Sequence, residues 1–121
     1  MFTENLPFLT PRTLMSEAIE IVTNGKLGIG IVTEKEVLTG IITDGDIRRA
    51  MQRLGQDFFT TPVSEIMSTN PKTISKDAKI VEAGEKMNHH SIHTLIVVDA
   101  NDHVAGVVDS FSCLPGTRFY H

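Results

Sequence analysis

The chain of 121 residues contains a single cysteine, and it has no long apolar run. Cys113 alone cannot form an intramolecular disulfide, and it cannot supply a cysteine-rich zinc site. No apolar stretch approaches the ~20 residues that a transmembrane helix needs. Residues 1–10 have neither the basic region nor the apolar region of a secretory signal. The expected compartment is therefore the cytoplasm.

Basic residues are also scarce. Eleven Lys and Arg residues against fifteen Asp and Glu residues give a net charge of −4 at pH 7. Without a basic excess, the chain is not expected to bind nucleic acid or an anionic membrane surface. Hydrophobic residues make up 40% of the chain, which is ordinary for a folded domain. The length predicts one domain, or two small halves that share a core.

Common signatures of phosphate loops, cation loops and catalysis are missing. The sequence has no Gly-x-Gly-x-x-Gly and no Gly-Lys-Ser/Thr motif. The run from Asp44 to Asp46 does not continue as a calcium loop, because Gly55 stands where an EF-hand has its glutamate. No nucleophile with a matched base and no acid–base pair is visible. The chain is therefore not expected to be an enzyme by itself.

The strongest positive feature is an internal repeat. Residues 17–20, 27–32 and 40–42 match residues 82–85, 92–97 and 106–108 in the same order. Each copy predicts a helix, a strand, a polar turn and a second strand. A unit of ~60 residues that occurs twice is typical of duplicated small domains rather than of a solenoid.

The pattern also predicts the boundaries of most elements. In the first half we expect a helix with Gly25 as its C-cap, strands at 29–33 and 37–43, and an amphipathic helix from Asp46, its N-cap, to Gly55. In the second half we expect a helix at 80–88 and strands at 94–99 and 104–108. There Pro115 and Gly116 leave little room for a closing helix. The two glycines Gly28 and Gly30 are expected to let a ligand or a neighbouring backbone approach the strand closely.

Several motifs resemble those of a known family. The segment GIITDGDIRR at residues 40–49 and the segment VSEIMSTNP at 63–71 look like parts of a tandem pair of CBS domains, a Bateman module. Residues 40–49 and LPFL at 6–9 are similar to the C-terminal regulatory region of arabinose-5-phosphate isomerases of the sugar-isomerase/CBS family. The resemblance implies an α+β fold of the CBS α/β type, with two βαββα halves packed about a pseudo-two-fold axis. Its expected divisions are a first motif at 6–55, a linker at 56–62, a second motif at 63–114 and a tail at 115–121.

The same resemblance implies a function. It indicates a regulatory module that senses a small nucleotide-type ligand, either an adenine nucleotide or a CMP-linked sugar acid, and that needs no cofactor. It also implies a homodimer formed through CBS–CBS contacts, and an N-terminal sugar-isomerase domain in a longer parent enzyme of lipopolysaccharide or capsule precursor biosynthesis. A stand-alone regulator is the other possibility for the chain. The alternative function is an assembly module that binds no ligand.

The residues predicted to bind the ligand fall into two groups, one in each half of the repeat. They are Thr43, Asp44, Asp46, Arg48, Arg49, His90, Ser91 and His93, and neither a catalytic nor a metal site is expected.

In the first group, a strand end followed by a helix start brings a hydroxyl, free amides and a carboxylate to one rim. The resemblance implies that Thr43 and Asp46 contact the ribose of a nucleotide. The alternative is that Asp46 only caps its helix. A guanidinium of Arg48 or Arg49 would hold a phosphate or a carboxylate, unless these side chains are solvated or pair with an aspartate.

In the second group, His90, Ser91 and His93 stand at a corner between helix and strand. They could contact a ligand or belong to a polar loop, and the three histidines His89, His90 and His93 are also weighed as zinc ligands. Where the first half has Thr43 and Asp46, the second has Asp109 and Ser112, which are poorer partners for a nucleotide. The expected stoichiometry is therefore one ligand per chain.

Overall fold

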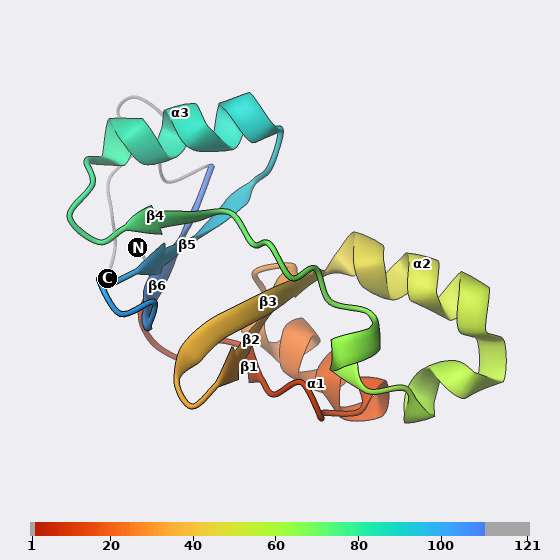
Figure 1. Cartoon of the computed structure of the whole chain (residues 1–121). Coiled ribbons are helices and arrows are strands. Elements are labelled where there is room, and N and C mark those ends of the chain that lie inside the picture. Colours follow the sequence, from red (N-terminus) through yellow and green to blue (C-terminus); the bar gives the residue numbers. More distant parts are fainter. Residues whose placement is uncertain (1, 111–121) are drawn as a thin grey trace. The chain divides into compact units, whose positions relative to one another are not determined.

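The structure is a computed structural model, and it describes residues 2–110. The two halves of the repeat each form a three-stranded sheet, as Figure 1 shows. In each sheet the central strand pairs in parallel with the strand before it and antiparallel with the strand after it. The order of elements predicted from the repeat, and the mixed α and β class, are confirmed. We describe residues 7–71 as the first unit, and residues 2–6 and 72–110 as the second unit.

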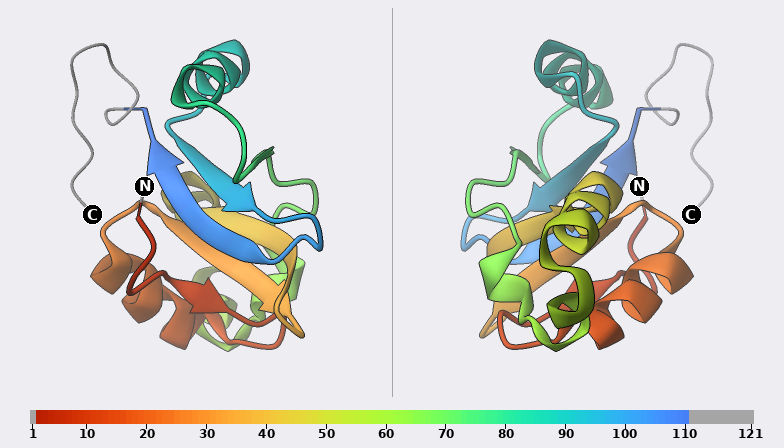
Figure 2. Two further views of the ribbon diagram at one scale, coloured as in Figure 1. Left: turned by 90° about the vertical axis from the view of Figure 1, so that its left-hand side faces the viewer. Right: turned by 90° about the vertical axis from the view of Figure 1, so that its right-hand side faces the viewer.

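The first unit contains three strands, two α-helices and two short 3₁₀-helices. They are β1 (Phe8–Leu9), α1 (Met15–Gly25), β2 (Ile29–Glu34), β3 (Val37–Thr43), α2 (Asp44–Leu54), η1 (Gly55–Thr60) and η2 (Val63–Glu65). Helix α1 lies against the sheet of β1 to β3, and both views of Figure 2 show this packing. The predicted strands and the helix end at Gly55 agree with the structure.

The end of α1 differs from the prediction. Gly25 is the last helical residue, and Lys26 takes the left-handed conformation that closes the helix, with φ of 59°. Gly25 serves packing instead. A Cβ atom at this position would lie 3.0 Å from the Cβ of Pro7. A small residue is needed at position 25 because Pro7 lies against α1 there. The C-cap residue of the helix is Lys26.

The core of the first unit reaches beyond its two main helices. Apolar side chains from α1 and the strands pack with Ala50 of α2, Phe58 of η1 and Val63 of η2. Phe58 is buried, although residues 56–62 look polar in sequence. Residues 56–62 therefore pack as part of the first unit, and η1 contributes its largest buried side chain.

The second unit has fewer elements among the described residues. They are β4 (Thr73–Ser75), α3 (Ile80–His90), β5 (Thr94–Val98) and β6 (Val104–Asp109). Phe2 adds a backbone bridge to Val107, with N–H···O distances of 2.7 and 2.9 Å. The core consists of Ala83 and Met87 of α3 and residues of β5 and β6. The segment at 111–121, with Ser112, Cys113, Pro115 and Gly116, lies outside the described residues.

Candidate functional site

The junction of β3 and α2 gathers the first group of predicted residues. Thr43 is the last residue of β3 and the N-cap of α2. Its hydroxyl accepts a hydrogen bond from the N–H of Asp46 at 3.1 Å, and its own N–H donates to Asp46 Oδ2 at 2.9 Å. This reciprocal pair is a capping box. The prediction of Asp46 as the N-cap was therefore wrong by three residues. Thr43 is the N-cap, and Asp46 is the third helical residue, whose carboxylate accepts from the Thr43 N–H.

A glycine brings a second segment next to this helix start. Gly28 has a φ of 72°, and its carbonyl accepts a hydrogen bond from the N–H of Asp44 at 3.0 Å. A Cβ atom at Gly28 would lie 3.2 Å from Asp44 Oδ2, so a larger residue would crowd the Asp44 carboxylate. The junction therefore presents Thr43, Asp44 and Asp46 beside the bare backbone of Gly28.

Gly30 has a different role from the one predicted. A Cβ atom here would lie 2.7 to 2.9 Å from side-chain atoms of Leu9, Ile42 and Val22. These side chains belong to the core of the first unit. Gly30 thus makes room for core packing within the unit, and the segment that approaches the ligand candidates is that of Gly28.

The two arginines of α2 differ in their partners. Arg49 donates to Asp46 Oδ1 at 2.8 Å, with 68% of its own side chain and 18% of the Asp46 side chain exposed. This is the aspartate partner that the sequence left open. Because α2 begins at Asp44, both arginines lie beyond its first turn, so the helix dipole opposes them less than expected. The Arg48 side chain is exposed and, within residues 2–110, makes no hydrogen bond or ion pair.

The Asp46 carboxylate has capacity left for a ligand. Its two oxygens accept one hydrogen bond each from the protein, whereas a carboxylate offers about four acceptor positions. The two carboxylates of the first turn also suit the positive end of the helix dipole. The junction therefore combines the held carboxylate of Asp46 with the exposed carboxylate of Asp44, and Arg48, which is unpaired among residues 2–110, follows in the same helix. Such a set suits a ligand with vicinal hydroxyls and a phosphate.

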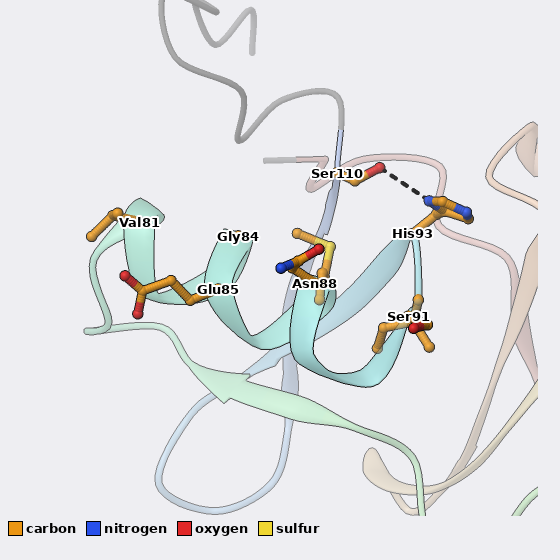
Figure 3. A pocket seen from close by; sticks show the side chains of 9 residues that line it. Val81, Gly84, Glu85, Asn88, Ser91, His93 and Ser110 are labelled. Atoms are coloured by element: carbon orange, nitrogen blue, oxygen red, sulfur yellow. Dashed lines mark hydrogen bonds between the residues drawn. The ribbon is translucent and has the colours of Figure 1, made fainter.

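The second group of predicted residues is only partly brought together. Ser91 takes the left-handed conformation at the end of α3, and its N–H donates to the carbonyls of Asn88 and Met87. The Nδ1 atom of His93 lies 3.4 Å from Ser110 Oγ. Ser91 and His93 line one pocket of the second unit, of ≈ 660 Å³, as Figure 3 shows. His90 does not line it, and its ring packs edge-on against His89 with centroids 4.9 Å apart.

The surroundings of His90 favour its neutral form. Partial removal from water lowers the pKa of its imidazole, and the nearby charges of Lys72, His89 and Lys86 lower it further. The Lys86 ammonium also donates to the carbonyl of Thr73. No group of three His, Cys, Asp or Glu residues in positions 2–110 is arranged to hold a metal ion. Over the same residues no helix is long and apolar enough to cross a bilayer.

Sequence reasoning missed Ser110, Asn88 and Glu85, which also line the pocket. A signal for Ser110 existed, since the repeat places it opposite Asp44 at the end of the last strand. Asn88 and Glu85 carry no such signal, because polar residues on a helix are usually solvated. The first predicted group belongs to the first unit and the second group to the second unit.

Comparison with known proteins identifies the family. The CBS domain model matches residues 1–53 and 63–114, and the chain belongs to the CBS domain family. The probable arabinose 5-phosphate isomerase of Haemophilus influenzae is 38% identical over 104 residues, which cover 86% of this chain and 31% of that protein. The isomerase KdsD of Francisella tularensis is 36% identical over 85% of this chain and 31% of its own length. The chain thus spans about a third of the length of these relatives, and it is homologous to their CBS region. The predicted resemblance is confirmed.

Solved structures show the same fold. A CBS domain protein of Pyrobaculum aerophilum, complexed with AMP, superimposes with a TM-score of 0.78 over 92% of this chain and 84% of its own, at 24% identity. The CBS domain pair of the protein MJ0100, in complex with 5′-methylthioadenosine and S-adenosylmethionine, has a TM-score of 0.74 at 27% identity, over 85% of this chain and 80% of its own. Both of these CBS proteins were solved with adenosine-containing ligands.

Proposed function

We propose that the chain is a regulatory CBS pair that binds an adenine nucleotide or a CMP-linked sugar acid and thereby modulates an arabinose 5-phosphate isomerase domain. The observation that carries the proposal is the junction of β3 and α2. There the capping box holds the Asp46 carboxylate in place while leaving part of it exposed. Membership of the CBS family and the adenosine ligands of related structures support the ligand class.

Each group at the junction has a role in this proposal. The carboxylates of Asp46 and Asp44 accept hydrogen bonds from the two hydroxyls of a ribose, which are good donors to a charged acceptor. The Thr43 hydroxyl contributes a further polar contact at the rim. Arg48, which has no partner among residues 2–110, binds the phosphate. Because Arg49 is already paired with Asp46, it acts by positioning that carboxylate.

The second unit is proposed to supply a weaker site. At the position of Thr43 it has Asp109, whose negative charge disfavours a nearby phosphate. We therefore propose one ligand per chain, held by the residues of the first unit. His90, Ser91 and His93 remain candidates for additional contacts. Their partial gathering around one pocket supports Ser91 and His93 more than His90.

The ligand would act by shifting populations. A nucleotide that prefers one conformation of the CBS pair stabilises that conformation and so biases an attached enzyme domain. In this proposal the parent is a cytoplasmic isomerase of lipopolysaccharide or capsule precursor synthesis, and the CBS pairs of two chains associate as a homodimer. The isomerase names of the relatives support the parent activity. A module that only assembles subunits is the rival function, and ligand binding separates the two.

A thermal-shift screen tests the proposal. We expect AMP or a CMP-linked sugar acid to raise the melting temperature, since a ligand at 100 times its Kd stabilises by ~2.7 kcal/mol. The Arg48→Gln variant should lose most of the shift for phosphorylated ligands and keep its own melting temperature. Arg53→Gln removes the same charge from the other end of α2 and is the matched control. No shift with any nucleotide or nucleotide sugar at millimolar concentration would favour the assembly module.

A further inference from the structure

Basic side chains gather where the end of α3 passes the start of β4. Lys86, His89 and His90 stand at positions i, i+3 and i+4 of α3, and such positions share one face of a helix. The Lys86 ammonium donates to the carbonyl of Thr73, the first residue of β4. Figure 1 shows that the two elements run in opposite directions, so the end of α3 lies beside the start of β4. The residue before Thr73 is a lysine as well. We call Lys72, Lys86, His89 and His90 the basic cluster.

The members of the basic cluster are close enough to act on one another. The rings of His89 and His90 pack edge-on, with centroids 4.9 Å apart. Partial removal from water lowers the pKa of His90, and the nearby charges of the other three members lower it further. Within residues 2–110 no carboxylate forms an ion pair with any of the four, although α3 itself carries Glu82 and Glu85. The cluster therefore lacks a counter-charge from the described part of the chain.

Neither the composition nor the helix accounts for the whole cluster. The chain has a net charge of −4, so basic residues are not in excess. The helix dipole favours the two histidines, which lie in the last turn of α3. It does not account for Lys72, which lies outside the helix. Like charges at positions i and i+4, such as Lys86 and a protonated His90, destabilise a helix. A bound anion would supply the counter-charge that is missing among residues 2–110.

We propose that the basic cluster binds the phosphate group of a small ligand, either free phosphate or a phosphate monoester. The ammonium groups of Lys72 and Lys86 are charged at neutral pH, and Lys86 has further N–H donors beside the one given to Thr73. The imidazoles of His89 and His90 add ring N–H donors. The two ammonium charges exceed the roughly half unit of negative charge at the C-terminal end of a helix, so the dipole of α3 does not prevent binding.

Imidazole NMR signals of the full chain test the proposal. The pKa of His90 is read from its ring signals between about pH 5 and 8, once in sodium phosphate and once in sodium chloride of equal ionic strength. We expect the pKa to be higher in phosphate, because a bound anion stabilises the imidazolium form. His103, in the turn between β5 and β6, lies outside the cluster, and its ring signals should respond alike in the two salts. An unchanged pKa of His90, or an equal response of His103, would overturn the proposal.

A matched pair of variants locates the site. Lys72 is exposed and makes no hydrogen bond or ion pair within residues 2–110, so Lys72→Gln should fold as the wild type does. It should raise the Kd for phosphate by about two- to fivefold, the loss expected for one exposed ion pair. Lys79→Gln removes the same charge just before α3 begins, and it should bind as the wild type does. Equal losses in both variants would mean attraction by overall charge, and would contradict the site.

The choice of probes separates the two sources of the phosphate group. The ring signals of His90 are followed at constant pH in titrations with inorganic phosphate and with methyl phosphate. Tighter binding of inorganic phosphate would assign the site to the free anion, and tighter binding of methyl phosphate would assign it to an ester. No binding of either probe at millimolar concentration would contradict the proposal. Neither probe carries a ribose or a base, so the result is separate from nucleotide binding at the junction of β3 and α2.

Discussion

The hydroxyl of Thr43 and the carboxylate of Asp46 stabilise the start of α2, and in the proposed function the same pair also binds the ligand. Each satisfies a backbone N–H that the start of α2 leaves without a helical partner. The pattern Thr-x-x-Asp is a sequence signal for a capping box, so this feature could be predicted from sequence alone. Assigning the cap to Asp46 placed the helix start too late. The pairing of Arg49 with Asp46 could not be predicted, because an exposed arginine has several possible partners.

Removing the Thr43 hydroxyl should destabilise the first unit. The change Thr43→Val keeps the shape of the side chain but leaves the Asp46 N–H without its acceptor. We expect the free energy of unfolding to fall by about 1 kcal/mol, as for other lost helix caps. Thr43→Ser retains the hydroxyl and is the matched control. Urea denaturation monitored by circular dichroism measures the difference, and equal losses in both variants would rule out the cap as the cause.

Acid should weaken the second unit through Asp99. Its Oδ1 accepts from the N–H groups of Asn101 and His103 at 2.8 and 3.0 Å, and these bonds lower the pKa of the carboxyl group. The ionised form is therefore favoured in the folded state. Its contribution to stability is present above pH ~4, the ordinary range for aspartate, and is lost as pH falls through the lowered pKa.

The variant Asp99→Asn tests this expectation, because asparagine keeps an acceptor oxygen but cannot titrate. Its free energy of unfolding should be lower than that of the wild type at neutral pH. The two should converge as the pH falls below ~4. Asp77→Asn, an exposed aspartate near β4, is the control. A constant difference between wild type and Asp99→Asn across the whole pH range would contradict the role of Asp99.

At the scale of elements, the long strands and helices could be predicted because their apolar residues repeat regularly. Strands β1 and β4 have only two and three residues, too few for an alternating pattern to show. The 3₁₀-helix η1 was predicted as linker because polar residues surround Phe58 in sequence. Only the folded chain shows that Phe58 turns inward while the next residue, Phe59, stays exposed.

The adjacent phenylalanines therefore offer a matched pair of variants. Phe58→Ala should lower the free energy of unfolding of the first unit by about 3–5 kcal/mol, because it empties a core position. Phe59 is 49% exposed and contacts Phe58 edge-on, so Phe59→Ala should cost about 1 kcal/mol or less. Denaturant unfolding of both variants measures the contrast. Similar costs for the two would mean that η1 is a linker and not part of the core.

At the scale of the whole molecule, the chain carries two related units, and we propose that the first has the more complete set of ligand-binding groups. The sequence is the basis of this proposal, since Asp109 and Ser112 replace Thr43 and Asp46 in the repeat. The pocket beside α3 could not be predicted, because it depends on where the fold brings Ser110, at the end of β6, relative to α3. The match to the CBS region of arabinose 5-phosphate isomerases supports the regulatory role that we propose for the chain.

The purified chain should therefore not convert arabinose 5-phosphate to its ketose isomer. The reaction needs a base that moves a proton between adjacent sugar carbons, and no pair of groups with that role is visible in the sequence. A coupled assay over hours, with a full-length isomerase as the positive control, measures turnover. Turnover that tracks the protein through purification and is lost in a variant of this chain would contradict the regulatory role.

Calorimetric titration of the chain with AMP, and separately with a CMP-linked sugar acid, tests the central claim most directly. We predict one site per chain for one of the two ligands. Asp46→Ala should weaken that site by about 1.5–3 kcal/mol, roughly 10- to 150-fold in Kd, as expected for hydrogen bonds to a charged group. Glu20→Ala, which removes an exposed carboxylate from α1, should bind as the wild type does. Two equivalent sites, or full affinity in Asp46→Ala, would contradict the account.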